Sequence, residues 1–385
     1  SCGQKGPRSM NIFSLFTLCG GLAFFLYGMT VMSKSLEKMA GGKLERLLKR
    51  MTSNPIKSLL LGAGITIAIQ SSSAMTVMLV GLVNSGVMEI GQTIGIIMGS
   101  NIGTTLTAWL LSLTGIESEN FFVNFLKPKN FSPLLALIGI LLIMGSKRQR
   151  RRDVGRVMMG FSILMYGMEL MSGAVSPLAD MPGFTHFMTA FTNPFLGVLV
   201  GAAFTGIIQS SAAAVGIVQT LANAGIIPLA SGAFVLFGTN IGTCITAVLA
   251  SIGTSRNAKR ATIIHLLFNI IGTVIFTLLF LIFPIAHIID GTLVLPGGLG
   301  TSLAAVLPKT AAGRVALIHT CFNIGTTLIL LPLGTYLARL AVRILPELPV
   351  SDTDTGEGMR LNYLKPITAN GKEGGLGVKS EAKRS

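Results

Sequence analysis

Two short polar clusters interrupt apolar stretches of the chain, and their residue types could bind an ion. The first is Gln70-Ser71-Ser72-Ser73 and the second is Gln209-Ser210-Ser211. Successive residues of a helix are rotated by about 100°, so adjacent polar residues cannot all lie on one face. We therefore expect the helix to open at each cluster and expose the backbone N–H groups of the next half-helix. Such a terminus, with hydroxyls beside it, can bind an oxyanion, and the oxygens can ligate Na⁺.

The simpler interpretation of these clusters is hydrogen bonding between helices by Ser and Gln side chains. A single copy would favour that interpretation. The second copy lies 139 residues after the first, within a longer match that has no gap. Residues 54–108 and 193–247 are identical at 21 of 55 aligned positions. Two equivalent copies favour a substrate site instead.

A second pair of motifs follows the clusters at the same offset. It reads Asn101-Ile102-Gly103-Thr104-Thr105 in the first copy and Asn240-Ile241-Gly242-Thr243 in the second. Each copy has two glycines four residues apart, Gly99 and Gly103 in the first and Gly238 and Gly242 in the second. This spacing is typical of closely packed membrane helices. The Asn and Thr side chains could in addition complete a cation site.

The elements that carry these motifs must lie in a membrane. Half of the 385 residues are hydrophobic, 12% are charged, and no Asp, Glu, Lys or Arg occurs in the 75 residues between Asp180 and Arg256. A soluble enzyme cannot shield such a run from water, and the net charge of +15 therefore indicates membrane orientation rather than nucleic-acid binding. Apolar runs lie at roughly residues 12–32, 58–88, 90–116, 131–146, 157–173, 195–225, 229–252, 261–283 and 314–338. They are free of charge except for Glu169, near the end of its run, and Arg314, at the start of the last run.

The distribution of Lys and Arg predicts which side each connection faces. Basic residues gather in 33–57, 147–156 and 253–260, whereas 174–194 has none and 117–130 has two lysines balanced by two glutamates. The positive-inside rule places the first three connections in the cytoplasm and the last two outside. The first repeat then runs from inside to outside and the second from outside to inside. Inverted repeats with broken helices are typical of secondary transporters, which bind substrate near the membrane midplane.

The remaining polar residues in the apolar runs argue against enzymatic chemistry. His265 and Asn269 recur as His319 and Asn323, each pair on one helix face,. We interpret them as an inward polar face, with a proton relay as the alternative. No Asp or Glu lies deep in an expected span, which suits Na⁺ coupling and an anionic substrate better than proton coupling. We expect no enzyme activity, no cofactor and no metal other than sodium.

Together these motifs resemble the type II sodium–phosphate cotransporter family and its bacterial relatives over about residues 12–340. The paired Gln-Ser-Ser motif in inverted repeats is the most specific mark of the resemblance. It implies Na⁺-coupled transport of inorganic phosphate by alternating access. One departure is Ala212, which stands where a fourth hydroxyl often occurs, so the two halves need not bind ions equally.

The resemblance also implies which residues bind. Phosphate would be held by the residues of the two clusters: Gln70, Ser71, Ser72, Ser73, Gln209, Ser210 and Ser211. Candidates for the sodium sites are the polar residues that flank them: Thr76, Asn101, Thr104, Thr239, Asn240 and Thr243.

The sequence therefore predicts an all-α polytopic membrane protein with two inverted-topology repeats and broken or re-entrant helices. We expect an N-terminal extension (1–11), repeat one (12–130), a linker helix with repeat two (131–260), C-terminal membrane helices (261–345) and a disordered cytoplasmic tail (346–385) in the inner membrane. Its partners would be phosphate, sodium and the lipid bilayer, without nucleic acid. The alternatives are a carrier of another oxyanion, a sodium-independent phosphate exporter, and a scaffold or sensor subunit that does not transport.

Overall fold

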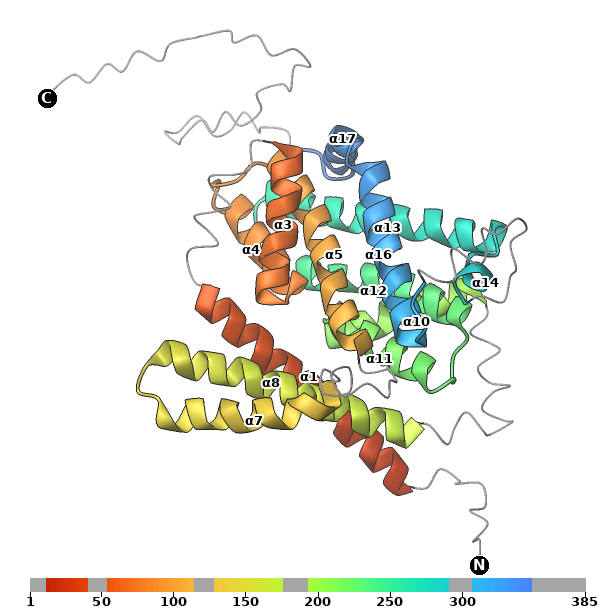
Figure 1. Ribbon diagram of the computed structural model, residues 1–385. Helices are drawn as coiled ribbons and strands as arrows, with labels where there is room; N and C mark the ends of the chain where they lie inside the picture. The colour runs from red at the N-terminus through yellow and green to blue at the C-terminus, as the bar shows by residue number, and fades with distance from the viewer. Residues whose placement is uncertain (1–11, 41–53, 114–127, 176–192, 291–306, 348–385) are drawn as a thin grey trace, which may run out of the picture. The chain divides into compact units, whose positions relative to one another are not determined.

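The computed structural model describes residues 12–40, 54–113, 128–175, 193–290 and 307–347. The regular elements in these ranges are all α-helices. They are α1 (Ile12–Ala40), α3 (Pro55–Ile69), α4 (Ser72–Asn84), α5 (Ile90–Ser112), α7 (Pro128–Gly145), α8 (Gln149–Val175), α10 (Pro194–Ile208), α11 (Ser211–Asn223), α12 (Leu229–Ala250), α13 (Arg256–Ile282), α14 (Ile285–Ile289), α16 (Ala311–Leu330) and α17 (Gly334–Ile344), shown in Figure 1.

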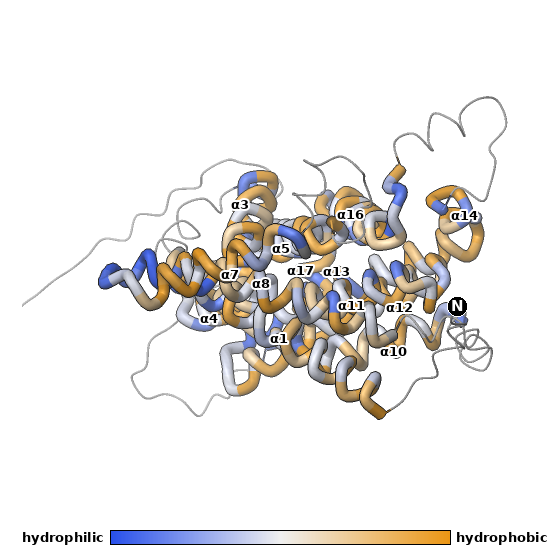
Figure 2. The backbone as a smooth tube through the Cα atoms, turned by 60° about the horizontal axis from the view of Figure 1, so that its bottom comes forward, coloured by the Kyte–Doolittle hydropathy of each residue, from blue (hydrophilic) through white to orange (hydrophobic). Residues whose placement is uncertain are grey.

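Several of these helices have the length and composition of membrane spans. Within the described ranges five are long and apolar enough to cross a bilayer: α1, α5, α12, α13 and α16. Figure 2 shows hydrophobic colour along most helices and a hydrophilic segment at the turn between α7 and α8. The chain is therefore a polytopic, all-α membrane protein, as the sequence predicted.

The sequence repeat is also a structural repeat. The bounds of α3 and α4 become those of α10 and α11 when 139 is added, and α5 and α12 begin at equivalent residues. Both α3 and α10 have 15 residues and both α4 and α11 have 13. Helices of these lengths rise about 20 Å, less than the roughly 30 Å of a hydrocarbon core. Each repeat thus has a broken pair of half-helices followed by one full span.

Local sequence explains where the half-helices begin and end. The Asn54 side chain accepts hydrogen bonds from the N–H groups of Ile56 and Lys57, and a proline follows at the first helical position, where its missing N–H does no harm,. Asn193 and Pro194 repeat this arrangement before α10. The helices end at Gln70 and Gln209, whose φ angles are 54° and 53°. Left-handed backbone stops a helix, which is how each Gln-Ser-Ser cluster opens it.

Close glycine contacts hold each half-helix against its span. A Cβ atom built on Gly99 would lie 1.9 Å from the carbonyl oxygen of Leu59, and one on Gly238 would lie 2.0 Å from that of Val198. Only glycine allows backbones to approach so closely. The glycines of the two Asn-Ile-Gly-Thr segments therefore have the packing role that the sequence predicted for them.

The contact between α1 and α8 shows that the repeats are inverted. These helices are equivalent, because Gly21 and Gly28 correspond to Gly160 and Gly167 at the offset of 139. Gly21 packs against Gly167, and Gly28 packs against Gly160. The second contact thus joins the residues equivalent to those of the first, with the two helices exchanged, which indicates a two-fold axis between the helices. The earlier glycine of α1 contacts the later glycine of α8, so the two helices are antiparallel and the copies run in opposite directions.

The helices with the His-x-x-x-Asn pairs link the two repeats. The Asn84 side chain accepts a hydrogen bond from the N–H of Ser255 before α13, and Asn223 accepts one from Ala312 in α16, both at 2.8 Å. Both histidines and both asparagines are buried, and each asparagine donates to the carbonyl of the histidine four residues earlier. This placement agrees with the interpretation of an inward polar face.

Two expected boundaries were wrong. The first apolar run was expected to end at residue 32, but α1 continues to Ala40, so Lys34 and Lys38 lie on the helix and not in a loop. The run 314–338 was expected as one segment, but α16 ends at Leu330 and α17 begins at Gly334. The remaining basic residues of 41–53, the connections 114–127 and 176–192, and the tail from 348 lie outside the described residues, so the predictions made for them are unchanged.

We predict that Gly99→Ala destabilises the protein. The added methyl group would overlap the Leu59 carbonyl and force α3 and α5 apart, at a cost of about 1–3 kcal/mol. Thermal unfolding of the purified protein in detergent should show a lower midpoint. Gly91→Ala is the matched control on the same helix, because no atom lies within 4 Å of its built Cβ. Equal midpoints for the two variants would contradict the packing described here.

Candidate substrate and ion site

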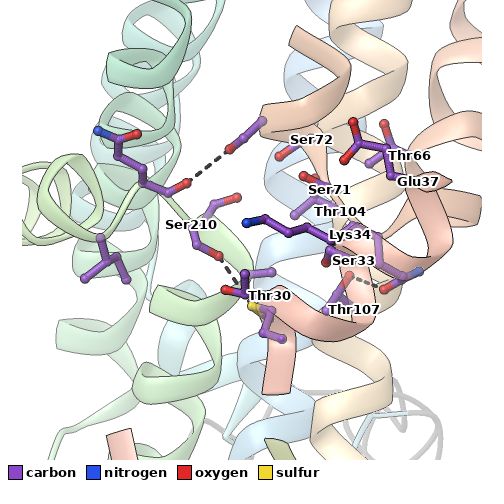
Figure 3. A pocket seen from close by; sticks show the side chains of 17 residues that line it. Thr30, Ser33, Lys34, Glu37, Thr66, Ser71, Ser72, Thr104, Thr107 and Ser210 are labelled. Atoms are coloured by element: carbon purple, nitrogen blue, oxygen red, sulfur yellow. Dashed lines mark hydrogen bonds between the residues drawn. The ribbon is translucent and has the colours of Figure 1, made fainter. Parts of the chain in front are cut away.

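The two Gln-Ser-Ser turns face a common cavity of about 250 Å³. All seven residues that the sequence predicted for phosphate line it, together with side chains from α1, α3 and α5. Figure 3 shows Ser71 and Ser72 on one side and Ser210 on the other. The lining consists of Met29, Thr30, Ser33, Lys34, Glu37, Thr66, Gln70, Ser71, Ser72, Ser73, Thr104, Thr107, Ile208, Gln209, Ser210, Ser211 and Ala212.

Each turn presents the N-terminus of a half-helix to this cavity. Ser71 caps α4, and its Oγ accepts a hydrogen bond from the N–H of Ala74 at 3.1 Å. Ser210 caps α11 in the same way, with Ala213 as the donor at 3.2 Å. The first N–H groups of a helix have no acceptor within the helix and carry partial positive charge. Two such termini therefore meet around one polar space.

Direct hydrogen bonds hold the turns in place. The Ser73 hydroxyl donates to the carbonyl oxygen of Gln209 at 3.1 Å, which joins the two repeats. The equivalent carbonyl, that of Gln70, accepts a hydrogen bond from Ser33 of α1 at 3.2 Å. Ala212 stands at the position equivalent to Ser73 and has no hydroxyl to donate. The loss of that one hydroxyl makes the connection between the repeats asymmetric.

The two glutamine side chains also differ. In repeat one Thr107 donates to Oε1 of Gln70 at 2.7 Å, and Nε2 of Gln70 donates to the carbonyl of Ile67 at 2.7 Å. Thr246 is the equivalent of Thr107, and its buried hydroxyl has no partner. Gln209 is exposed to the cavity. The glutamine side chain is therefore hydrogen bonded within repeat one, whereas the equivalent threonine hydroxyl of repeat two has no partner.

A second threonine pair repeats this difference. Thr66 donates to the Ser100 hydroxyl at 2.8 Å in repeat one. Thr205, its equivalent in repeat two, has a buried hydroxyl without a partner. Buried polar groups without partners are uncommon in native structures and call for an explanation.

The residues predicted for sodium lie around the cavity rather than in it, with one exception. Thr104 lines it, and its hydroxyl donates to the carbonyl of Ser100 at 3.0 Å. Thr76 and Thr243 are buried and donate to carbonyls four residues earlier. Thr239 donates to the carbonyl of Leu236 at 2.8 Å.

The two asparagines in the predicted sodium set are buried as well. Asn240 donates to the carbonyl of Leu236 at 3.4 Å, whereas Nδ2 of Asn101 has no partner. Of the six predicted sodium residues, the structure thus brings Thr104 alone to the cavity wall.

Sequence reasoning missed the contribution of α1. Thr30, Ser33, Lys34 and Glu37 follow the spacing of one helical face and line the cavity,. The signal was present in the spacing, but the helix was expected to end at residue 32, before three of these four residues. Thr66 and Thr107 were missed as well, although they flank the predicted motifs.

An ion pair joins α1 to the start of α8. Lys38 Nζ lies 3.4 Å from Asp153 Oδ1 of α8, and Arg156 Nη1 lies 2.6 Å from the same oxygen. Burial opposes ionisation of Asp153, but hydrogen bonds from Gln149 and Arg156 and the charge of Lys38 hold the pKa of its carboxyl below the usual range. The carboxylate therefore stays charged at neutral pH. It anchors Lys38 on α8.

Comparison with known proteins identifies the family. The profile of the Na⁺/Pi-cotransporter family matches residues 24–173 and 164–288. The chain belongs to this family. The two matched segments begin at nearly equivalent positions, 140 residues apart, and they overlap within α8. No solved structure matches this chain.

Relatives of the chain occur in bacteria and mammals. It is 30% identical over 327 residues to the uncharacterised protein YqeW of Bacillus subtilis, covering 84% of this chain and 96% of YqeW. It is 28% identical over 343 residues to the candidate inorganic phosphate export protein YjbB of Escherichia coli, and spans 89% of this chain but 58% of YjbB. Over 99 residues, 25% of this chain and 15% of the relative, it is 37% identical to sodium-dependent phosphate transport protein 2A of Rattus norvegicus.

We predict that the two turns can be cross-linked. Ser73→Cys with Gln209→Cys, in a background without native cysteines, should react with a short bifunctional thiol reagent, because the turns are joined by the 3.1 Å hydrogen bond. The product should be an intramolecular link, detected by mass spectrometry of the digested protein. The control pair is Ser85→Cys with Gln209→Cys, because Ser85 caps the far end of α4. Equal yields for both pairs would contradict the shared cavity.

Proposed function

We propose that this protein is a sodium-coupled transporter of inorganic phosphate that works by alternating access. The observation that carries the proposal is the meeting of two half-helix N-termini, from oppositely directed repeats, around one hydroxyl-rich cavity. Family membership supports the same function. We place the protein in the inner membrane with its C-terminal tail in the cytoplasm, on the distribution of basic residues.

Phosphate fits the chemistry of the cavity. The anion offers several acceptor oxygens, and the cavity offers donors from Ser71, Ser72, Ser73, Ser210 and Ser211, with Gln70 and Gln209 beside them. The positive ends of α4 and α11 favour its charge without any proton transfer. These groups can replace part of the hydration shell of phosphate. No covalent step is required, so the proposal includes no enzyme activity and no cofactor.

Sodium would offset the charge of phosphate and bind to neutral oxygens. Hydroxyl, amide and carbonyl oxygens are the ligands that a hard cation prefers. The hydroxyls of Thr205 and Thr246 are buried without partners in repeat two, while their equivalents in repeat one are hydrogen bonded. Thr76, Asn101, Thr104, Thr239, Asn240 and Thr243 remain candidates for further ligands.

The difference between the repeats supports alternating access. Equivalent sequences have unequal hydrogen bonds in this structure, as an asymmetric state of a two-fold transporter requires. The opposite state would exchange the roles of the two halves around the same site. In both states the same residues would bind the substrate. Sodium would shift the population from one state to the other only if it bound one of them more tightly.

The main alternative is a transporter that uses the same cavity without coupling to sodium. It is a sodium-independent phosphate exporter, and the similarity to the candidate inorganic phosphate export protein YjbB supports the export part of this alternative. Another oxyanion would use the same donors. A scaffold or sensor subunit would have no need of a cavity shared by two inverted repeats.

We expect phosphate uptake into proteoliposomes that contain the purified full chain. Radiolabelled phosphate should accumulate faster with Na⁺ outside than with choline outside, because sodium binding would stabilise the loaded state. Empty liposomes are the control. Equal uptake in Na⁺ and choline would remove the sodium coupling and favour the exporter, and uptake no faster than in empty liposomes would remove the transport function.

We expect Gln70→Ala and Gln209→Ala each to reduce phosphate uptake by at least about tenfold, since each removes a polar side chain from the site,. Gln92→Ala is the matched control, because Gln92 lies at the start of α5 and caps that helix with Glu89. Retained size-exclusion profiles would show that the variants are folded. Normal uptake by both site variants would mean that other residues bind the substrate.

A further inference from the structure

Charged side chains enter the cavity from α1, and neither motif of the repeats contains them. Lys34 is the one cation and Glu37 the one carboxylate among the described residues that line it. Figure 3 shows the ammonium group of Lys34 directed into the space between Ser71 and Ser210. In sequence Lys34 looks like an orientation charge of a loop, but α1 includes it.

The neighbours of Lys34 on α1 fix its position at the first turn. Ser33 donates to the carbonyl oxygen of Gln70 at 3.2 Å, so the backbone beside Lys34 is held against that turn. One helical turn further on, Lys38 pairs with Asp153 of α8. These contacts on either side of Lys34 join α1 to the first turn and to α8. Lys34 and Glu37 line the cavity from α1.

A fixed cation here changes what the cavity can hold. The hydroxyls and helix N-termini are neutral or partial donors, whereas the ammonium carries a full positive charge with three donors. A charge-assisted hydrogen bond to an anion is about twice as strong as a neutral one. Glu37 lies one turn from Lys34 on the same helix face, and its negative charge opposes an anion and weakens the field of the lysine.

We propose that Lys34 is a direct ligand of the anion in this cavity and that Glu37 tunes its strength. Lys34 supplies the full positive charge that the two Gln-Ser-Ser turns lack, and it selects for a multiply charged tetrahedral oxyanion. The negative charge of Glu37 lowers the attraction of the cavity for the anion and keeps binding weak enough for release. The inference deepens the proposed function and rests on it for the identity of the anion.

The test is a charge series on α1 with two readouts. Equilibrium binding of inorganic phosphate to the purified full chain gives Kd, and proteoliposome uptake gives KM and the maximal rate. Lys34→Met should weaken Kd and raise KM by about tenfold, with a smaller change in the maximal rate. Lys34→Arg should restore most of the affinity. Glu37→Gln should change Kd in the opposite direction, tightening it about two- to threefold.

The control is Lys57→Met, because Lys57 is an exposed lysine in the first turn of α3 and does not line the cavity. It should leave Kd and KM unchanged. Two results would overturn the inference: a Kd for Lys34→Met within twofold of the unchanged protein, or weakening by Glu37→Gln equal to that by Lys34→Met. The second result would show a disturbance of α1 rather than an effect of charge.

The two readouts separate this inference from the proposed function. Phosphate binding without uptake would reject transport, and the effect of Lys34→Met on Kd would still decide the role of the lysine. If Lys34→Met transports phosphate with an unchanged KM, the role of Lys34 as an anion ligand is rejected and the transport function stands. Absence of both binding and uptake in the unchanged protein would reject both.

Discussion

Hydrogen bonding of backbone groups inside a membrane is the constraint on which this structure depends. In hydrocarbon an unsatisfied backbone group costs several kcal/mol, so a helix can open only where protein or water covers the break. At the break in repeat two, the Gln209 carbonyl accepts a hydrogen bond from Ser73 of the other turn. At the break in repeat one, the Gln70 carbonyl accepts one from Ser33 of α1. Both turns, each at the N-terminus of a half-helix, line the same cavity. The two breaks thus share one polar space, which is the candidate site.

Inversion of the repeats gives this site two unequal halves. Antiparallel packing of α1 and α8 through Gly21, Gly28, Gly160 and Gly167 brings equivalent turns together from opposite directions. The two-fold relation is inexact, because Ala212 lacks the hydroxyl of Ser73. In repeat one the hydroxyls of Thr66 and Thr107 donate to other side chains, and in repeat two the equivalent buried hydroxyls of Thr205 and Thr246 have no partner. Equivalent threonines thus differ in hydrogen bonding between the two halves, as the proposed alternation between two facing states requires.

The first helix has a larger part than its sequence suggests. It packs against its own repeat partner α8, supports one Gln-Ser-Ser turn through Ser33 and brings two charges to the cavity. Its Lys38 also pairs with the ionised Asp153 of α8. The cavity thus combines the repeat motifs with the helix that supports them.

The sequence by itself determined the class of protein, the repeat, its inversion and the seven residues of the two turns, because hydropathy, charge and a constant offset of 139 are local or periodic signals. It also identified the glycines of close packing. Tertiary structure decided which of the polar residues outside the two turns reach the cavity. Thr104 does so and Thr76 does not, although both flank the motifs, because side-chain direction depends on how each helix is rotated against its neighbours. Lys34 and Glu37 were assigned to a loop for the same reason: charge marks a membrane boundary in sequence, and only packing shows that these charges face inward.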